Sequence, residues 1–517
     1  MKRSIYSRLL MSSSPHVAAL VLLASLSLAS ADELTNTKPN IIFILSDDQR
    51  FNSLSMTGHP VTETPHLDIL AKEGVFFDNA FVTSPICGPS RANIFTSQWE
   101  RKNRVGFTSI SKNFVSSEAF ENSFLMQFKQ AGYSTAFIGK HHTKIVDRGN
   151  QPLKQNIDFC YYASGHLGFH PAKKHKVFRN LKNQSQTEGL FEAFEAYLKP
   201  GNDYSYFYEN ADPSIKNQLK QREPNKPFCA WINLNLPHQS SFGGMGTKPS
   251  DPKFYSTLYE DKQDKFVMPE GYPNNLTLPE NVITRAEQPG YYRFSEKSLT
   301  ASFLKTSRAV YGIDQFVGNL RSMLNDLKLA ESTIIVFFSD NGLLYGEHGL
   351  GGKTMLYEES VHVPLIVYSP FLANEKRGAK RAELVVGQDI PATMLDMCGL
   401  AVPETYQGES MLPLLEGEQT PWRKDVFLEN LFTDQGYPRQ ESVRGQRFKY
   451  IRYYSKDKDR KKYLPDGIRG EKPIYEELFD LKNDPKELLN LADNAKYVKI
   501  LDDHRKRCSE LATELVE

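Results

Sequence analysis

The sequence predicts an α/β protein with a large, mostly parallel, doubly wound sheet flanked by helices. Up to about Gly399, continuous apolar runs alternate with amphipathic helical patterns, which is typical of parallel strands buried on both faces. After Pro403 the runs are short and partly alternating (residues 426–428, 448–453 and 475–479), and a charged helix is expected over residues 498–515. We therefore expect a main domain over residues 36–415 and a C-terminal α+β subdomain, with a small antiparallel sheet, over residues 420–517.

The first 31 residues are expected to be a secretory signal peptide. Lys2, Arg3 and Arg8 form a positive region, residues 17–28 are apolar, and the small residues 29–31 provide a cleavage site near Ala31. The apolar run is too short for a membrane anchor, and no later segment is apolar enough to span a bilayer. We therefore expect an exported protein, periplasmic or secreted, without stable membrane insertion.

The main domain should contain five buried strands and two well-marked helices. The first helix begins after Thr64, a capping residue, with Pro65 in its first turn, and it ends at Gly74. The second is marked by apolar residues from Ile313 to Leu327. The strands are expected over residues 40–45, 134–138, 228–236, 333–338 and 364–368. Residues 145–225 and 240–295 have weak periodicity, and we interpret them as irregular insertions over one rim.

Charge and cysteine content narrow the range of functions. The 517-residue chain has a formal net charge of +1, so no strong positive field argues for nucleic acid as a partner. Export would permit disulfides, but the pairing of Cys160, Cys229, Cys398 and Cys508 cannot be deduced from the sequence. Cys229 and Cys398 lie in apolar runs and are expected to be buried thiols.

Polar side chains follow four of the predicted strands, directly after each strand ends. They are Asp47 with Asp48, Lys140 with His142, His238, and Asp340 with Asn341. In an open parallel sheet, ligands bind beyond the carboxyl ends of the strands, so these residues should share one pocket. Alone, Asp47 could cap a helix and Asp340-Asn341 could form a turn. Together, three acids in one crevice would repel each other without a cation, and their oxygens suit Ca²⁺ or, less well, Mg²⁺.

A cysteine at the predicted start of a helix marks a place that could hold an anion. Cys87 lies in a turn rich in Pro and Gly, and Pro89 suits the first helical turn. Helix N-termini favour anions, and Arg91, Lys140 and Lys353 could stabilise negative charge on a bound ester. Histidines could transfer protons. The alternatives for Cys87 are a packed thiol or half of a disulfide.

Several motifs together resemble the type I sulfatases of the alkaline phosphatase superfamily. The resemblance covers nearly the whole chain after the predicted signal peptide. The matching motifs are Asp47-Asp48, the Cys-x-Pro-Ser-Arg maturation signature of residues 87–91, Pro237-His238, Ser339-Asp340-Asn341-Gly342, Gly346-Glu347-His348-Gly349 and Lys353. Gly139-Lys140-His141-His142 resembles the family's Gly-Lys-Trp-His. In residues 357–364, His362 stands where the family commonly has Arg. The roles of His348 and His362 stay open.

The resemblance implies a mechanism. A formylglycine-generating or anaerobic maturation enzyme would convert Cys87 to formylglycine (3-oxoalanine), whose hydrate would attack sulfur, displace the alcohol and then release sulfate. Asp47, Asp48, Asp340, Asn341 and the modified Cys87 would bind Ca²⁺. Arg91 and His142 would orient and activate the hydrate, Lys140 and Lys353 would bind sulfate oxygens, and His238 would contact sulfate or protonate the leaving group.

The expected substrate is a sulfated poly- or oligosaccharide, with specificity determined by the rim loops. One alternative is a phosphomonoesterase, phosphodiesterase or phosphonate hydrolase of the same superfamily. Another is a non-catalytic carbohydrate-binding relative. The sugar, the sulfate position, endo or exo action and the oligomeric state stay open.

Overall fold

The computed structural model describes residues 38–107, 114–143, 145, 152–199, 201–270, 272, 278, 279, 281, 282, 295–432, 438–455 and 471–516. The predicted signal peptide and its cleavage site near Ala31 lie outside the described residues. Among the described residues, no helix is both long and apolar enough to cross a membrane.

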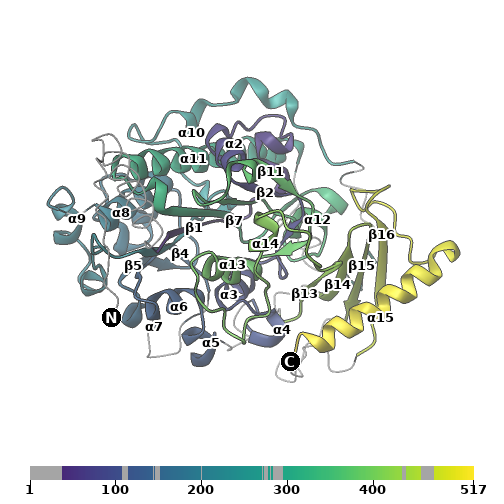
Figure 1. Ribbon diagram of the computed structural model, residues 1–517. Helices are drawn as coiled ribbons and strands as arrows, with labels where there is room; N and C mark the ends of the chain where they lie inside the picture. The colour runs from purple at the N-terminus through teal and green to yellow at the C-terminus, as the bar shows by residue number, and fades with distance from the viewer. Residues whose placement is uncertain are drawn as a thin grey trace, which may run out of the picture. The chain divides into compact units, whose positions relative to one another are not determined.

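An eight-stranded sheet forms the centre of the main domain (Figure 1). Its strand order is β11-β2-β10-β7-β1-β6-β4-β5. All neighbours are parallel except β10, which runs antiparallel to both β7 and β2. The strands are β1 (Asn40–Ser46), β2 (Val75–Phe77), β4 (Ser134–His141), β5 (Phe159–Ser164), β6 (Phe228–Asn233), β7 (Thr333–Ser339), β10 (Leu365–Tyr368) and β11 (Ala379–Arg381). The prediction of a mostly parallel sheet is confirmed.

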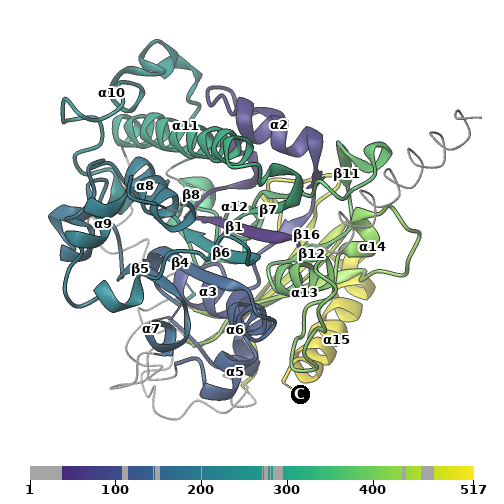
Figure 2. The ribbon, with the colours of Figure 1, turned by 60° about the vertical axis from the view of Figure 1, so that its left-hand side comes forward.

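The sheet is covered on both faces, which explains why its strands are continuously apolar. On the central strand β1, Ile42 and Ile44 pack among residues of α2 (Pro65–Glu73), α8 (Gln186–Leu198) and α11 (Glu296–Asp326). The alternate residues Ile41, Phe43 and Leu45 face α3 (Cys87–Thr96), α6 (Phe124–Gln130) and α13 (Asp389–Asp396). Figure 2 shows these two groups of helices on opposite sides of the strands.

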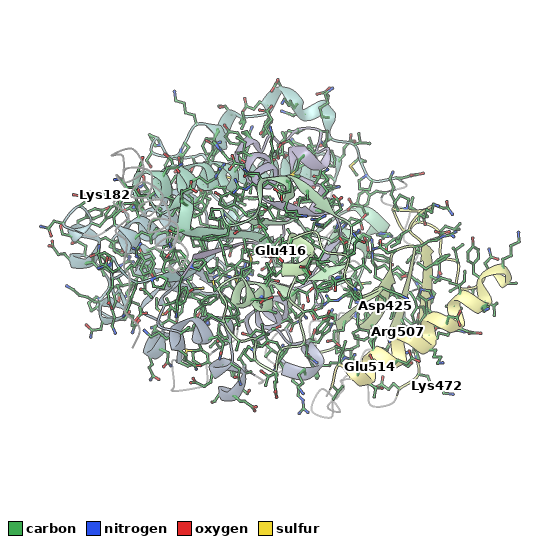
Figure 3. The ribbon with its side chains drawn as sticks, in the orientation of Figure 1. Lys182, Glu416, Asp425, Lys472, Arg507 and Glu514 are labelled. Carbon is green, nitrogen blue, oxygen red and sulfur yellow. The ribbon has the colours of Figure 1, made fainter. Side chains whose placement is uncertain are left out.

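The C-terminal part contains the expected antiparallel sheet and terminal helix. Strands β13 (Asp425–Asn430), β14 (Arg439–Gly445), β15 (Phe448–Tyr454) and β16 (Tyr475–Asp480) pair in sequence order, and α15 (Val498–Glu514) contacts the first three of them. Arg507 of α15 forms an ion pair with Asp425 at the start of β13, with 3.0 Å between Nε and Oδ2 (Figure 3).

A buried arginine joins this sheet to the helices beside α3. Arg101 lies in α4 (Glu100–Asn103) and is 1% exposed. Its Nε is 2.7 Å from Glu429 Oε2 on β13, and its Nη2 is 2.7 Å from Glu441 Oε1 on β14. Both carboxylates are buried; Arg101 compensates the charge of Glu429, and Glu441 shares Arg101 with Arg452, whose Nη2 is 2.5 Å from Glu441 Oε2.

The remaining elements are short. The helices are α5 (Ser117–Glu121), α7 (Pro152–Asn156), α9 (Ser205–Glu209), α10 (Phe254–Thr257), α12 (Glu358–Val361) and α14 (Leu412–Leu415). The strand pairs are β3 (Ala80–Phe81) with β12 (Val385–Val386), and β8 (Leu344–Tyr345) with β9 (Gly351–Gly352).

The structure corrects parts of the prediction. Residues 145–225 are not simply irregular insertions, since they contribute the edge strand β5 and the 13-residue helix α8. Helix α11 begins at Glu296, well before Ile313, because its first turns are largely polar and give little periodicity. Strand β2 was not predicted. Cys160, Cys229 and Cys508 are buried free thiols, as expected for Cys229, whereas Cys398 is only half-buried at the end of α13.

Candidate active site

The two predicted pairs of acidic and amide residues meet because β1 and β7 are neighbours in register. Ser46 pairs with Ser339, so Asp47-Asp48 and Asp340-Asn341 leave the sheet side by side. The Asp48 backbone N–H donates to Asp340 Oδ1 at 3.3 Å, and Asn341 Nδ2 donates to Asp48 Oδ1 at 2.6 Å. All four residues are at most 3% exposed. The structure thus brings these residues together at the carboxyl edge of the sheet.

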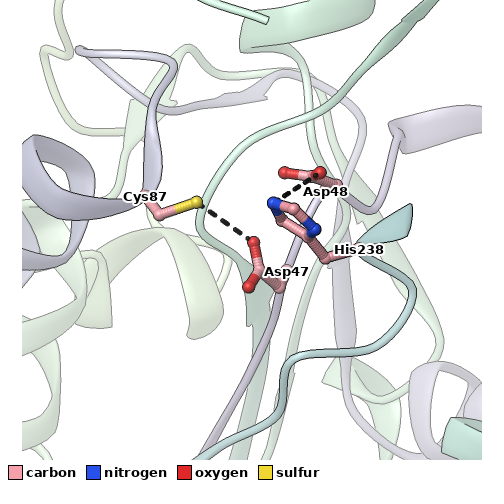
Figure 4. A group of neighbouring side chains, drawn as sticks. All are labelled: Asp47, Asp48, Cys87 and His238. Atoms are coloured by element: carbon pink, nitrogen blue, oxygen red, sulfur yellow. Dashed lines mark hydrogen bonds and ion pairs between the residues drawn. The ribbon is translucent and has the colours of Figure 1, made fainter. Parts of the chain in front are cut away.

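Cys87 is the first residue of α3 and faces this cluster. Its Sγ lies 3.3 Å from Asp47 Oδ1 and 2.7 Å from Lys353 Nζ. The contact with Asp47 is drawn as a dashed line in Figure 4. The thiol is 1% exposed. Burial, with the negative charge of Asp47 in second place, raises the pKa of the thiol to about 12. The unmodified side chain is therefore a neutral thiol at physiological pH.

Three predicted cationic residues pair with the three carboxylates. Lys140 on β4 contacts Asp47 Oδ2, and Lys353 Nζ lies 2.5 Å from Asp48 Oδ1. Arg91, one turn after Cys87 on α3, places Nε 2.7 Å from Asp340 Oδ2 and Nη1 2.6 Å from Asn233 Oδ1. Arg91 therefore fixes the Cys87 helix against the strand ends.

The environment separates the pKa values of the three acids. Burial disfavours the charged form of Asp47, but Lys140, His238, Lys353 and Arg91 outweigh it and hold its pKa well below the usual value. Burial raises the pKa of Asp48 to about 7, against the attraction of Lys353. Burial and Asp47 also raise the pKa of Asp340. The ionised forms of Asp48 and Asp340 are therefore unfavourable in this site, and an additional positive charge nearby would stabilise them.

The donor set fits a hard divalent cation. Ligand atoms of Asp47, Asp48, Cys87 and His238 all lie within 4.8 Å of one another. The buried Oδ1 atom of Asn341 has no hydrogen-bond partner among the described residues, so an acceptor oxygen remains uncommitted beside Asp48. Carboxylate and amide oxygens are the donors that Ca²⁺ and Mg²⁺ prefer. Asp47, Asp48, Asp340 and Asn341 could hold such an ion next to Cys87.

The predicted histidines lie at the same edge. His238 Nε2 is 3.6 Å from Asp48 Oδ2. Its Nδ1 accepts a hydrogen bond from the Ser240 backbone N–H at 3.1 Å, so the proton of a neutral ring is on Nε2, which faces the acids. His142 follows β4, and its buried Nδ1 has no described partner. Burial, followed by the charge of a neighbouring lysine, keeps the pKa of each ring well below its usual value.

A third histidine, His166, belongs to this group and was not predicted. Its ring centroid is 4.4 Å from that of His238 and 5.8 Å from that of His142. It follows β5, just as the predicted residues follow their strands. The position of His166 after a strand could therefore have identified it. The aromatic run before His166 was instead interpreted as part of an irregular insertion.

His348 and His362, whose roles stayed open, contact other groups. His348 stacks on Tyr357 at 3.8 Å and faces Glu359, with 3.6 Å between Nε2 and Oε2. His362 stacks on Phe51 at 3.9 Å, and its Nε2 is 2.8 Å from the Asp78 carbonyl oxygen. His348 therefore contacts the start of α12, and His362 packs on the segment that follows β1.

The mostly parallel sheet, with carboxylates, cationic side chains and a cation-binding donor set at its carboxyl edge, is the arrangement of an α/β enzyme that binds an anionic group. A family model described as "Sulfatase" matches residues 39–400. A second model, "N-sulphoglucosamine sulphohydrolase, C-terminal", matches residues 346–514. The chain therefore belongs to the sulfatase family and is a sulfatase, as the motifs predicted.

One curated relative is a sulfatase along most of its length, and two solved structures share the fold. The chain is 28% identical to an N-acetylglucosamine-6-O-sulfatase of Bacteroides thetaiotaomicron, over 95% of this chain and 89% of the relative. A solved structure bound to its substrate D-glucosamine-2-N,6-O-disulfate matches with a TM-score of 0.64 and 23% identity, over 93% of this chain and 98% of that one. A phosphonate monoester hydrolase of Agrobacterium radiobacter matches with a TM-score of 0.65 and 19% identity, over 92% and 96%. The fold alone therefore does not select the ester.

Proposed function

We propose that the protein is an exported sulfatase that removes sulfate from a sulfated carbohydrate, with formylglycine made from Cys87 and a bound Ca²⁺. The observation that carries the proposal is the position of Cys87. It begins α3 within the sequence Cys-Gly-Pro-Ser-Arg, and its Sγ lies 3.3 Å from Asp47 Oδ1 and 2.7 Å from Lys353 Nζ. The substrate class is supported by the relative named for N-acetylglucosamine-6-O-sulfate chemistry.

Each side chain has a role that its contacts allow. The formylglycine hydrate supplies an oxygen nucleophile, and the cation supplies positive charge beside it. Asp47, Asp48, Asp340 and Asn341 hold the cation. Lys353 contacts Cys87, and Lys140 contacts Asp47 beside it; both bind the sulfate oxygens as negative charge develops there.

Three further residues orient groups or move protons. Arg91 holds the Cys87 helix against Asp340 and Asn233. His142 directly follows the end of β4. Together they orient and activate the nucleophile. His238 directs Nε2–H toward the cluster, which suits proton donation to the alcohol that leaves.

Two assays test the ester and the sugar. Matured protein is first compared on aryl sulfate, aryl phosphate and aryl phosphonate under identical conditions. We expect sulfate to give the highest kcat/KM, since the Cys87 segment matches the sulfatase maturation signature. Faster phosphate or phosphonate hydrolysis would reverse the assignment. A panel of defined sulfated saccharides then identifies the substrate; turnover of aryl sulfate but of no saccharide would refute the carbohydrate proposal alone.

We also propose export, with cleavage of the signal peptide near Ala31, and a catalytic domain over residues 36–415 followed by the subdomain of residues 420–517. Sequencing the N-terminus of protein recovered from outside the cytoplasm tests the first part. A mature chain beginning near Asp32 is expected. An intact Met1 terminus on the exported protein would contradict cleavage.

A further inference from the structure

The ring of His166 has no hydrogen bond to any described residue, although it lies among the candidate catalytic side chains. Its Nδ1 is buried and has no hydrogen-bond partner in the part of the chain that the structure describes. The ring packs against His238, at 4.4 Å between centroids, and is 5.8 Å from His142. A buried polar atom without a partner is costly, so its persistence at a site calls for an explanation.

The backbone around His166 is held firmly, in contrast to its ring. The His166 carbonyl accepts from Lys174 Nζ at 3.2 Å and lies 3.1 Å from His175 Nε2. On either side, Gly165 N donates to the His141 carbonyl at 3.1 Å, and Leu167 N donates to Asn235 Oδ1 at 2.8 Å. The segment is therefore tied to the ends of β4 and β6, which place the ring beside His238.

Exposure increases from the base of the site toward His166. The Lys140 and Asp47 side chains are 0% exposed, and the His238 side chain is 15% exposed. His166 is also partly exposed, and it packs directly on His238. Because the sulfur atom of a substrate must approach Cys87 at the base, the alcohol part must lie farther out, at the level of the two partly exposed histidines.

The charge state of the ring indicates what it can bind. Burial, followed by the positive charge of Lys140, lowers the pKa of His166 to about 4. The ring is therefore neutral near pH 7 and offers one N–H donor and one acceptor nitrogen. Such a ring complements a neutral hydroxyl group better than a sulfate oxygen, whereas Lys140 and Lys353 provide full positive charges for the sulfate.

We propose that His166 is a substrate-contacting residue that hydrogen-bonds a hydroxyl group on the sugar part of the sulfate ester. The proposal rests on the proposed function and adds a residue that distinguishes sugar sulfates from simple aryl sulfates. An aryl sulfate without hydroxyl groups offers no partner for this ring, so the contribution of His166 should appear only with the sugar.

The test compares His166→Ala and His166→Gln with the wild type on two substrates. These are the best sugar sulfate of the saccharide panel and para-nitrophenyl sulfate. For His166→Ala we expect kcat/KM to fall about tenfold on the sugar, the size of one hydrogen bond, mainly through KM. We expect less than about a twofold change on the aryl sulfate. His166→Gln keeps an N–H donor and should recover part of the loss.

The control variant is His504→Ala, which removes a histidine of the C-terminal helix α15 whose Nδ1 contacts the Ile500 carbonyl and which the proposed site does not use. It should behave like the wild type on both substrates. Equal losses on sugar and aryl sulfate, or no loss on the sugar, would overturn the proposal. If the wild type hydrolyses both substrates, either result leaves the proposed function intact. An inactive mature wild type would instead refute the proposed function.

Discussion

Sulfate hydrolysis should depend entirely on conversion of Cys87. Burial and the charge of Asp47 raise the pKa of this thiol to about 12. At pH 7.5 only roughly one molecule in 10⁴ to 10⁵ would carry a thiolate, the reactive form of cysteine. Protein made without a maturation enzyme, and the variant Cys87→Ala, should therefore both show at least about 10³-fold lower kcat/KM than converted protein.

The assay uses preparations that differ in the converted fraction. Conversion lowers the mass of the peptide containing Cys87 by about 18 Da, which mass spectrometry quantifies. Activity on aryl sulfate should rise in proportion to that fraction, on a line through the origin. Cys160→Ala, which alters a buried thiol on β5, is the matched control and should mature and hydrolyse normally. Wild-type rates from protein whose Cys87 is wholly unmodified would refute the reasoning.

Three more predictions concern the cation and stability. Asn341→Ala removes the unpartnered oxygen beside Asp48, so the Ca²⁺ concentration for half-maximal activity after chelation should rise about tenfold; an unchanged titration would exclude Asn341 as a ligand. Arg101→Ala leaves the buried Glu429 without the guanidinium that it pairs with, while Glu441 keeps Arg452, so urea denaturation should show a loss of about 3 kcal/mol; a loss below about 1 kcal/mol would contradict the importance of this network. Burial raises the pKa of Asp314 to about 7, so the folded state retains a proton that the unfolded chain releases near pH 4. Wild-type stability should therefore fall by up to about 1.4 kcal/mol per pH unit between about pH 4 and 7. Asp314→Asn should show a flatter profile in that window, and identical slopes would contradict the assignment.

The sequence was most informative where buried strands end in polar residues. Asp47-Asp48 and Asp340-Asn341 were predicted to meet because both follow apolar runs that fit strands buried on both faces of a parallel sheet. The register of β1 with β7 then brings the two pairs into contact. The direction of a strand was harder to predict. The apolar run in β10 would be the same in a parallel or an antiparallel strand, and the structure shows that β10 is antiparallel to β7.

His166 was missed for a physical reason. The strand before it, β5, is at the edge of the sheet and has the sequence Phe-Cys-Tyr-Tyr-Ala-Ser, without the run of aliphatic residues that identifies a central strand. Its neighbour α8 contains Gly189, which weakens a helical pattern because Gly is a poor helix former. The local sequence therefore favours a strand only weakly in this segment. Strand β5 is stabilised by its pairing with β4, and a short window of sequence does not reveal pairing between distant segments.

The charges of the site suggest why a cation and a sulfate ester should bind together. Asp47, Asp48 and Asp340 face Lys140, Lys353 and Arg91, so three negative and three positive groups nearly balance. A divalent cation on the carboxylates would make the cluster net positive, and an anionic ester would then lower its electrostatic energy. Because the same lysines contact both the acids and the region of Cys87, cation and substrate should strengthen each other's binding. By linkage, sulfate should raise Ca²⁺ affinity by the same factor by which Ca²⁺ raises sulfate affinity.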